Sequence, residues 1–467
     1  MESAVASLYS WLLSSGGSLL GFVLGTVLIA QLLRRRTSPI STLAWLLTIV
    51  LIPWIGVPLY LLLGGRKIHR MVRRKPRLSL HQHPAARLDR RHAVERLFDS
   101  YALPPATLGN ALHFHASGEE YYARLMTLLR EARESIYVSM YVFTLDAVGE
   151  AVLALLAERA RDGLRVRLLL DGYGALSTRQ RRFAALERAG GRVAWFNPVW
   201  ALPFQNRANL RNHRKLVLVD ERRAITGGAN IAREYLGPQP WPGRWVDLSF
   251  ELAGPAVAAL REIFVADWRY ASGEALPAAP PPTAAVPDGT ARVQVIPSGP
   301  DMRADPLYDA LLTLCFEAER RIWIVTPYFV PDDALLRSLL LALHRGVAVR
   351  VVVPTVSNHR LPDLAGRSYL RELQAAGAEV LRYRPRMMHG KAVLIDDRVA
   401  LLGSANIDMR SLLLNYETGV FVYSPAELKA VRDWIAALSA DCGRGLPPAG
   451  QAIELVEGVA RLLAPQL

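Results

Sequence analysis

The sequence predicts an α/β protein built from two similar halves that follow two N-terminal membrane helices. The first observation is an octet, HRKLVLVD at 213–220, whose spacing H-x-K-x-x-x-x-D returns as HGKAVLID at 389–396. The second is that strand-like and helix-like patterns alternate in the same order before each octet, as expected for an α/β sheet. The third is a pair of apolar runs near the start of the chain, each of about the 20 residues that a membrane helix needs.

The two apolar runs lie at about 11–33 and 42–63, within a predicted membrane region of residues 1–65. The first run lacks a basic start and an Ala-x-Ala cleavage signal, so we expect an anchor rather than a signal peptide. Pro53 and Pro58 interrupt the second run, so we expect it to kink or to turn back within the bilayer rather than to cross it straight. We expect residues 1–65 to anchor the protein as two spans or as a shallow hairpin.

A basic segment at 66–105 follows the apolar runs and is predicted to be a juxtamembrane linker. Residues 1–91 carry a net charge of +11 out of +14 for the whole chain. The positive-inside rule then places the catalytic body in the cytoplasm, although two full spans would leave the arginines at 34–36 outside. The cluster at 66–70 and 73–75 either attracts anionic lipid or belongs to a solvated linker. The rest of the chain is nearly neutral, which argues against nucleic acid as a partner.

Beyond residue 105 the chain falls into a first half at 106–272, a Pro-rich linker at 273–289 and a second half at 290–467. In the first half the pattern predicts strands at 135–141, 165–171 and 193–196, with helices at 147–161 and 179–189. In the second half it predicts strands at 322–325, 347–353 and 380–383, with helices at 334–343 and 368–376. Each octet follows as a further strand, so the second half repeats the first.

Each octet is predicted to form a strand that presents a histidine and a lysine on one face. Alternation along a strand places His213 beside Lys215, and His389 beside Lys391. An imidazole can attack phosphorus or carry a proton, and an ammonium group can neutralise a phosphoryl oxygen. A single short motif is usually a chance match, but two copies indicate one shared site that acts on a phosphodiester.

A glycine turn with an amide side chain follows each octet at the same offset. The turns are GGAN at 227–230 and GSAN at 403–406, and they end in Asn230 and Asn406. Each amide can donate a hydrogen bond to a bound anion. The chain has only two cysteines, so neither a disulfide framework nor a thiolate metal site is expected.

The duplicated octet resembles the signature of the phospholipase D superfamily, and within it the chain is similar to the bacterial cardiolipin synthases. The closer resemblance rests on three stretches, at 44–67, 326–332 and 460–465. It implies two phospholipase D-like α/β sandwich halves that pack about a pseudo-twofold axis and bring both His–Lys pairs into one cleft. It also implies a bacterial inner-membrane phosphatidyltransferase that joins two phosphatidylglycerol molecules into cardiolipin and glycerol, with no metal or cofactor.

The resemblance further implies a phosphohistidine intermediate. His213 is expected to be the nucleophile and His389 the acid and base, although the duplication leaves the reverse assignment open. The residues expected to bind the phosphoryl oxygens are Lys215, Lys391, Asn230, Asn406 and, more weakly, Ser404.

Four acids accompany the octets. Asp247 and Glu417 lie downstream of them, where family members carry an acid that orients a histidine. Asp220 and Asp396 complete the catalytic motif. Because they end each octet at odd spacing from the histidine, we interpret these two aspartates as mainly structural groups that brace a turn.

Other functions are compatible with the same residues. A hydrolytic phospholipase D would pass the phosphatidyl group to water, and the octets do not distinguish it from a synthase. A phosphodiesterase acting on nucleic acid is disfavoured by the nearly neutral catalytic body. A non-catalytic membrane scaffold is disfavoured because both octets carry every His, Lys and Asp of the motif. The sequence leaves the oligomeric state open.

Overall fold

The computed structural model describes residues 26, 39–52, 56–57, 60, 75–78, 80, 92–175, 180–198, 210–278, 286 and 289–462. The chain divides into two compact units, at 1–71 and 72–467. Each unit has buried apolar side chains of its own.

The N-terminal unit contains helix α2 (Pro39–Leu51), whose 13 residues extend about 20 Å. The apolar core of a bilayer is about 30 Å thick. Trp45 lies edge-on to Tyr60, with ring centroids 5.3 Å apart. Within the part of the chain that the structure describes, no helix has both the length and the apolar character needed to cross a membrane. The two predicted membrane helices are thus not confirmed, and the first run at 11–33 lies, except for Thr26, outside the described residues.

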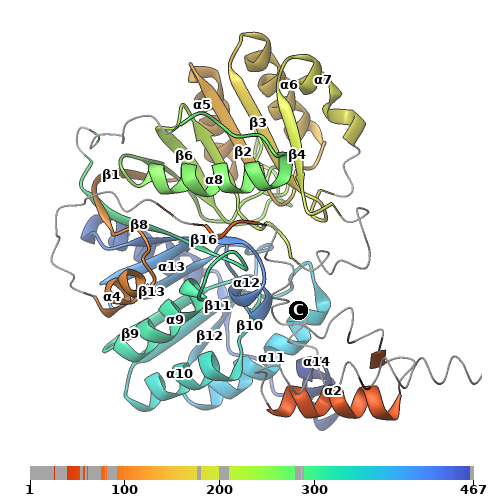
Figure 1. The fold of residues 1–467 in the computed structure, drawn as a ribbon. Coiled ribbons are helices and arrows are strands. Elements are labelled where there is room, and N and C mark those ends of the chain that lie inside the picture. Colours follow the sequence, from red (N-terminus) through yellow and green to blue (C-terminus); the bar gives the residue numbers. More distant parts are fainter. Residues whose placement is uncertain are drawn as a thin grey trace, which may run out of the picture. The chain divides into compact units, whose positions relative to one another are not determined.

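Residues 72–467 are built on a sheet of 15 strands in the order β17-β12-β11-β9-β13-β14-β16-β8-β1-β7-β6-β5-β2-β3-β4 (Figure 1). The first half supplies β1 (Thr107–Phe114), β2 (Ser135–Met140), β3 (Arg165–Asp171), β4 (Arg192–Phe196), β5 (Leu216–Val219), β6 (Arg223–Gly227) and β7 (Ser249–Ala253). The second half supplies β8 (Ala291–Ser298), β9 (Arg321–Val325), β11 (Ala348–Pro354), β12 (Glu379–Tyr383), β13 (Ala392–Ile395), β14 (Val399–Gly403), β16 (Glu417–Val422) and β17 (Cys442–Arg444). Two short strands, β10 (Phe329–Val330) and β15 (Ile407–Asp408), pair in parallel beside it.

The two halves have the same strand order. Read outward from β1 the order is β1-β7-β6-β5-β2-β3-β4, and outward from β8 it is β8-β16-β14-β13-β9-β11-β12, with β17 added at the edge. β1 and β8 pair antiparallel at the centre, with Thr107 opposite Val293. A twofold axis through this central pair would generate the same arrangement. The prediction of two repeated α/β halves is therefore confirmed.

Helices pack on the sheet in both halves. The first half carries α5 (Gly118–Glu131), α6 (Ala147–Arg161), the 3₁₀ turn η2 (Gln180–Phe183), α7 (Ala184–Arg188) and α8 (Val257–Ser272). The second half carries α9 (Pro306–Glu317), α10 (Asp333–His344), α11 (Arg360–Ala375), α12 (Met409–Leu413), α13 (Pro425–Ala440) and α14 (Gln451–Leu462). Side-chain caps begin several of them: Asp146 accepts from the first turn of α6, and Asp332 accepts from that of α10.

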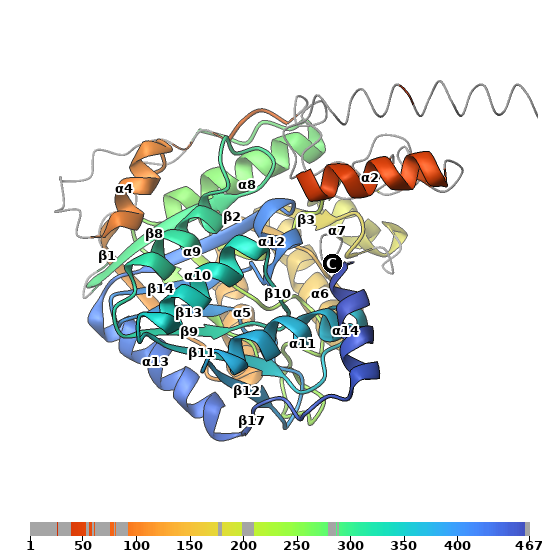
Figure 2. The ribbon, with the colours of Figure 1, turned by 90° about the horizontal axis from the view of Figure 1, so that it is seen from below.

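Alternate residues of the octet strands face cores on opposite sides of the sheet. In β5, Val217 joins the core of the first half, whereas Leu218 joins a central core. In β13, Val393 joins the core of the second half and Leu394 joins the same central core. The central core includes residues of α8 and α13, and Figure 2 shows α13 on the opposite side of the second-half strands from α9 and α10. Because both halves contribute to it, this core packs them together.

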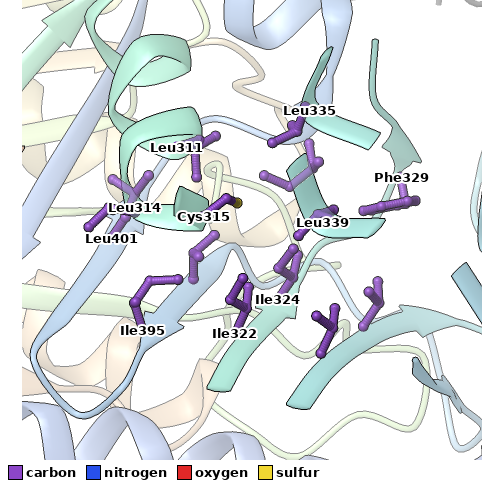
Figure 3. Close-up of a cluster of buried hydrophobic side chains, with 14 of the residues drawn as sticks. Leu311, Leu314, Cys315, Ile322, Ile324, Phe329, Leu335, Leu339, Ile395 and Leu401 are labelled. Carbon is purple, nitrogen blue, oxygen red and sulfur yellow. The ribbon is translucent and has the colours of Figure 1, made fainter. Parts of the chain in front are cut away.

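The core of the second half also accounts for one of the two cysteines. Cys315 of α9 packs there against apolar residues of α10 and the sheet, as Figure 3 shows. Burial raises the pKa of its thiol to about 11, so the thiol is protonated at neutral pH. Cys315 is therefore a packing residue, like the leucines and isoleucines around it.

The predicted strands and helices of both halves are present, with two differences in the helices. The helix expected at 179–189 consists of the η2 turn followed by α7, and the helix expected at 368–376 begins earlier, at Arg360. After α8, Gly273 adopts a φ of 75°, and most of the Pro-rich linker lies outside the described residues.

The expected linker at 66–105 holds a folded element, α4 (Ala93–Ser100). Val94 and Phe98 on this helix are fully buried in the core of the second half. Phe98 lies edge-on to Phe421 of β16, with ring centroids 4.9 Å apart. Residues 93–100 therefore belong to the folded body, because their apolar face is buried there rather than solvated.

Candidate active site

The His and Lys of each octet lie just before a strand, not within it. β5 and β13 each begin one residue after the lysine. At the histidines the backbone pairs with the opposite half: His213 N–H donates to the Tyr416 carbonyl at 2.9 Å, and His389 N–H donates to the Val246 carbonyl at 2.6 Å. The prediction that these residues lie on a strand of their own sheet is wrong at this point. The crossing to the other half brings the two octets together.

Each histidine contacts an acid from the other half. Nδ1 of His213 lies 2.9 Å from Oε1 of Glu417, and Nδ1 of His389 lies 2.6 Å from Oδ2 of Asp247. Glu417 is fully buried and the Asp247 side chain is 5% exposed. The sequence placed one acid after each octet but did not indicate that the acids are exchanged between the halves. Both His–acid contacts therefore exist only when the two halves are assembled.

Aromatic rings flank both imidazoles. Tyr141 lies edge-on to His213 with centroids 4.8 Å apart, and Tyr235 and Trp245 lie 5.1 Å and 5.5 Å from His389. Burial lowers the pKa of His213 to about 4 and lowers that of His389 well below its usual value. Both imidazoles are therefore neutral at pH 7.

The two octet lysines lie close enough to affect the pKa of both histidines. Lys215 donates to the His213 carbonyl at 2.7 Å, and Lys391 donates to the His389 carbonyl at 2.5 Å. Nζ of Lys391 also lies 2.8 Å from Nδ1 of His389. Burial lowers the pKa of Lys391 to about 8 and lowers that of Lys215 well below its usual range. Each lysine also lowers the pKa of the histidine in the opposite half, as expected when the two octets lie close together.

The two acids differ in their environments. Burial raises the pKa of Asp247 to about 7, against the opposing charge of the lysines. For Glu417, burial also raises the pKa, but His213, a lysine and the Ser404 hydroxyl together outweigh it and hold the pKa below its usual value. Ser404 Oγ donates to Glu417 Oε2 at 2.5 Å. The matching residue of the first half is Gly228, where a Cβ would lie 2.2 Å from Asp247 Oδ1.

The candidate phosphate-binding amides, on Asn230 and Asn406, are both buried. Asn230 Oδ1 accepts from the Val142 N–H at 3.0 Å. Asn406 hydrogen-bonds with Asp408, and its buried Oδ1 has no partner among the described residues. Ser404, the weaker candidate, is committed to Glu417. The Ser404 hydroxyl therefore contacts the acid that lies beside His213.

The aspartates that end the octets bind the backbone of a neighbouring strand. Asp220 accepts from the N–H groups at 133–135, at the start of β2. Asp396 accepts from those at 319–321, at the start of β9. Both lie at the far end of the octet strand from the histidine and have φ of 51° and 53°. Both aspartates thus hold the backbone at the start of a neighbouring strand, and their structural role stays a prediction.

Sequence reasoning missed a buried ionic group beneath the first octet. Lys75 lies in the basic segment expected to attract lipid or to be solvated, yet it is 3% exposed and its Nζ lies 2.5 Å from Oδ1 of Asp267. Asp267 also binds Arg214, the residue between His213 and the octet lysine. Lys75 is buried because the carboxylates of Asp267 and Asp301 need buried cations. The sequence signal for this buried ionic group is Arg214, a charged residue between the histidine and the lysine of the first octet.

Comparison with known proteins places this geometry in a family. The family model described as cardiolipin synthase, PLD-like domain, matches residues 125–264 and 311–439, which include both octets and both acids. A second model, phospholipase D-nuclease N-terminal, matches residues 23–65. The chain belongs to the cardiolipin synthase family of the phospholipase D superfamily. This confirms the superfamily predicted from the duplicated octet, the family predicted from the three further stretches, and the predicted class of enzyme, a phosphatidyltransferase.

Relatives in this family match along most of their length. The chain is 32% identical to a cardiolipin synthase of Geobacillus kaustophilus over 100% of this chain and 95% of that relative. It is 32% identical to the probable cardiolipin synthase YwiE of Bacillus subtilis, over 84% of this chain and 80% of the relative. Among solved structures, a phosphatidylserine synthase of Haemophilus influenzae superposes with a TM-score of 0.61 at 18% identity, covering 80% of this chain and 99% of that one. The last similarity supports the fold alone.

Proposed function

We propose that the protein makes cardiolipin by transferring a phosphatidyl group from one phosphatidylglycerol to another through a phosphohistidine. The observation that carries the proposal is the pair of His–acid contacts, each assembled across the two halves, with both octet lysines close enough to lower the pKa of both histidines. Membership of the cardiolipin synthase family supports the choice of substrate. Two histidines in one site suit a reaction with two proton transfers and one covalent intermediate.

His213 is the proposed nucleophile. Its neutral ring donates from Nδ1–H to the ionised Glu417, which leaves the lone pair of Nε2 free to attack phosphorus. Ser404 holds Glu417 in its charged form. A charged carboxylate at Nδ1 also stabilises the positive charge that the ring acquires when the phosphorus–nitrogen bond forms.

His389 is the proposed acid and base. With the pKa of Asp247 near 7, the protonated acid can donate to Nδ1 of His389, so that the ring carries its own proton on Nε2. When the bond from phosphorus to the glycerol oxygen breaks, His389 gives this proton to the leaving oxygen and takes the Asp247 proton at Nδ1. The hydroxyl of a second phosphatidylglycerol then returns a proton to His389 as its oxygen attacks phosphorus and the phosphorus–nitrogen bond breaks.

The remaining polar groups bind the phosphoryl oxygens. Lys215 and Lys391 supply positive charge in a buried site, where its effect on a developing negative charge is large. Asn230 and Asn406 are placed at the ends of the two glycine turns and are proposed to donate from their amides.

The protein is proposed to act at a bacterial inner membrane, held there by residues 1–65, with the catalytic body in the cytoplasm. The two apolar runs and the basic residues that follow them support this location. A site held at the bilayer meets lipid acceptors at a high local concentration, which favours a second phosphatidylglycerol over water.

Lipid product analysis tests the proposal. The detergent-solubilised protein is incubated with phosphatidylglycerol alone, and the products are identified by mass spectrometry. We expect cardiolipin and free glycerol, absent with His213→Ala and unchanged with His344→Ala, an exposed histidine on α10 that serves as the matched control. Phosphatidic acid as the sole product would replace the synthase by a hydrolytic phospholipase D, and no turnover would contradict the choice of donor.

A further inference from the structure

A buried group of four charges lies beneath the first octet. Nζ of Lys75 is 2.5 Å from Oδ1 of Asp267 and 2.7 Å from Oδ2 of Asp301. Nη1 of Arg214 is 2.8 Å from both carboxylate oxygens of Asp267, and the side-chain amide of Asn212 donates to the same carboxylate at 3.1 Å. All four charged side chains are at most 2% exposed. Two cations and two anions make the group neutral, the condition under which buried charges are tolerated.

This group contacts the His213–Glu417 pair through the residues next to it. Arg214 directly follows His213, and its Nε donates to the Glu417 carbonyl at 3.1 Å. The ammonium group of Lys75 lies 4.3 Å from the centre of the Tyr416 ring, on the residue that precedes Glu417. Tyr416 in turn accepts the backbone hydrogen bond from His213. Side chains of the buried group therefore contact the Glu417 carbonyl and the Tyr416 ring, next to the His213–Glu417 pair.

The second octet lacks an equivalent group among the described residues. The residue between His389 and Lys391 is Gly390, where a Cβ would lie 2.5 Å from the ring of Trp434 on α13. A side chain at position 390 does not fit unless the Trp434 ring moves. Lys75, for its part, comes from outside both repeats, four residues after the N-terminal unit ends. The first octet is thus completed by a residue that the duplication does not supply.

We propose that Lys75 is a positioning residue for His213. Its ammonium group pairs with the carboxylates of Asp301 and Asp267. Arg214 can then keep its hydrogen bonds to Asp267 and to the Glu417 carbonyl. Without Lys75, the group has one uncompensated negative charge, and Arg214, now 4.0 Å from Asp301, is drawn toward it and away from Glu417. The inference rests on the proposed roles of His213 and Glu417.

The test compares Lys75→Met with two other full-length variants. Methionine has a similar length and no charge. Arg77→Met, two residues along and exposed, is the matched control for loss of a cation in this segment. The double variant Lys75→Met with Asp301→Asn removes one charge of each sign and makes the buried group neutral again. Turnover is measured as total phosphatidyl transfer from phosphatidylglycerol, cardiolipin plus phosphatidic acid, so that the result does not depend on which acceptor the wild-type protein uses.

We expect Lys75→Met to lower kcat about 10- to 100-fold, because displacement of a reacting group by an ångström costs that much, with little change in KM. The added negative charge raises the pKa of His213, which faces Glu417, Lys215, Lys391 and the Tyr141 ring, so the acid limb of kcat/KM moves to higher pH. The double variant should restore most of the kcat and the position of the limb. Arg77→Met should change neither.

Three outcomes would overturn the inference. One is a Lys75→Met protein with wild-type kcat, and another is an equal loss in Arg77→Met. The third is an acid limb that does not move in Lys75→Met, together with a double variant that is as inactive as Lys75→Met. A lysine with a purely structural role would change only thermal unfolding and the active fraction. If Lys75→Met alone does not fold, an active double variant supports the charge argument and an inactive, folded one contradicts it.

Discussion

The two octets share their His, Lys and Asp but not their surroundings. The first contains Arg214, which binds Asp267 together with the buried Lys75. Its histidine contacts Glu417, which also accepts a hydrogen bond from Ser404. The second contains Gly390, packed under Trp434, and its histidine contacts an aspartate with a glycine in place of that serine. One acid is held ionised and the other has its pKa raised to about 7. A duplicated motif can therefore provide two histidines with different proton chemistry.

The largest expected difference between the two histidines appears when the leaving group no longer needs a proton, because the acid then becomes dispensable and the nucleophile does not. With phosphatidylglycerol, we expect His213→Ala and His389→Ala each to lose about 10⁴-fold in turnover, because a nucleophile and an acid are both required. With phosphatidyl-p-nitrophenol, whose leaving group departs without a proton, His389→Ala should still release a burst of p-nitrophenol and His213→Ala should not. A burst from His213→Ala alone would reverse the assignment.

The two acids should also differ when each is replaced by its amide. Glu417→Gln is expected to lower kcat about 10³-fold, since the amide no longer stabilises the charge on His213. Asp247→Asn should lower kcat about tenfold and should remove the alkaline limb near pH 7 from the pH profile of kcat. In the wild-type protein this limb arises because, as pH rises through the raised pKa of Asp247, the Asp247–His389 pair loses the proton that His389 donates. pH profiles of kcat for both variants check this. Equal losses with unchanged limbs would show that the acids are interchangeable.

Ser404→Gly makes the second turn resemble the first. The variant removes a charge-assisted hydrogen bond to Glu417, so we expect the pKa of Glu417 to rise and kcat at pH 6 to fall about tenfold, with less effect at pH 8. Ser404→Thr, which retains the hydroxyl, is the control. A pH-independent loss in Ser404→Gly would contradict the proposed role of the serine.

The smallest effect on turnover is expected from Asp396→Asn. This buried carboxylate accepts from three backbone N–H groups at the start of β9, and an amide can satisfy only part of them. We expect a loss of about 1–3 kcal/mol in the free energy of unfolding and nearly unchanged kcat. Chemical denaturation and the lipid assay measure the two quantities. A large fall in kcat of the folded variant would place Asp396 in the chemistry.

Sequence by itself determined the repeat, the alternating strands and helices, and the identity of the reacting residue types. These features follow from local periodicity and from a motif with fixed spacing, which do not depend on distant contacts. The helix at 147–161 and the strand at 165–171 were predicted with their observed ends for this reason.

Only the tertiary structure decided how the repeats combine. The exchange of Asp247 and Glu417 between the halves depends on which residues the twofold arrangement places opposite each octet, and no local pattern carries that information. The local sequence is equally uninformative about Lys75. It lies in a segment with the composition of a solvated basic linker, but it is buried because it pairs with Asp267 and Asp301, which are distant in the sequence. Buried charges are paired by contacts between residues far apart in sequence, because leaving them unpaired away from water costs too much.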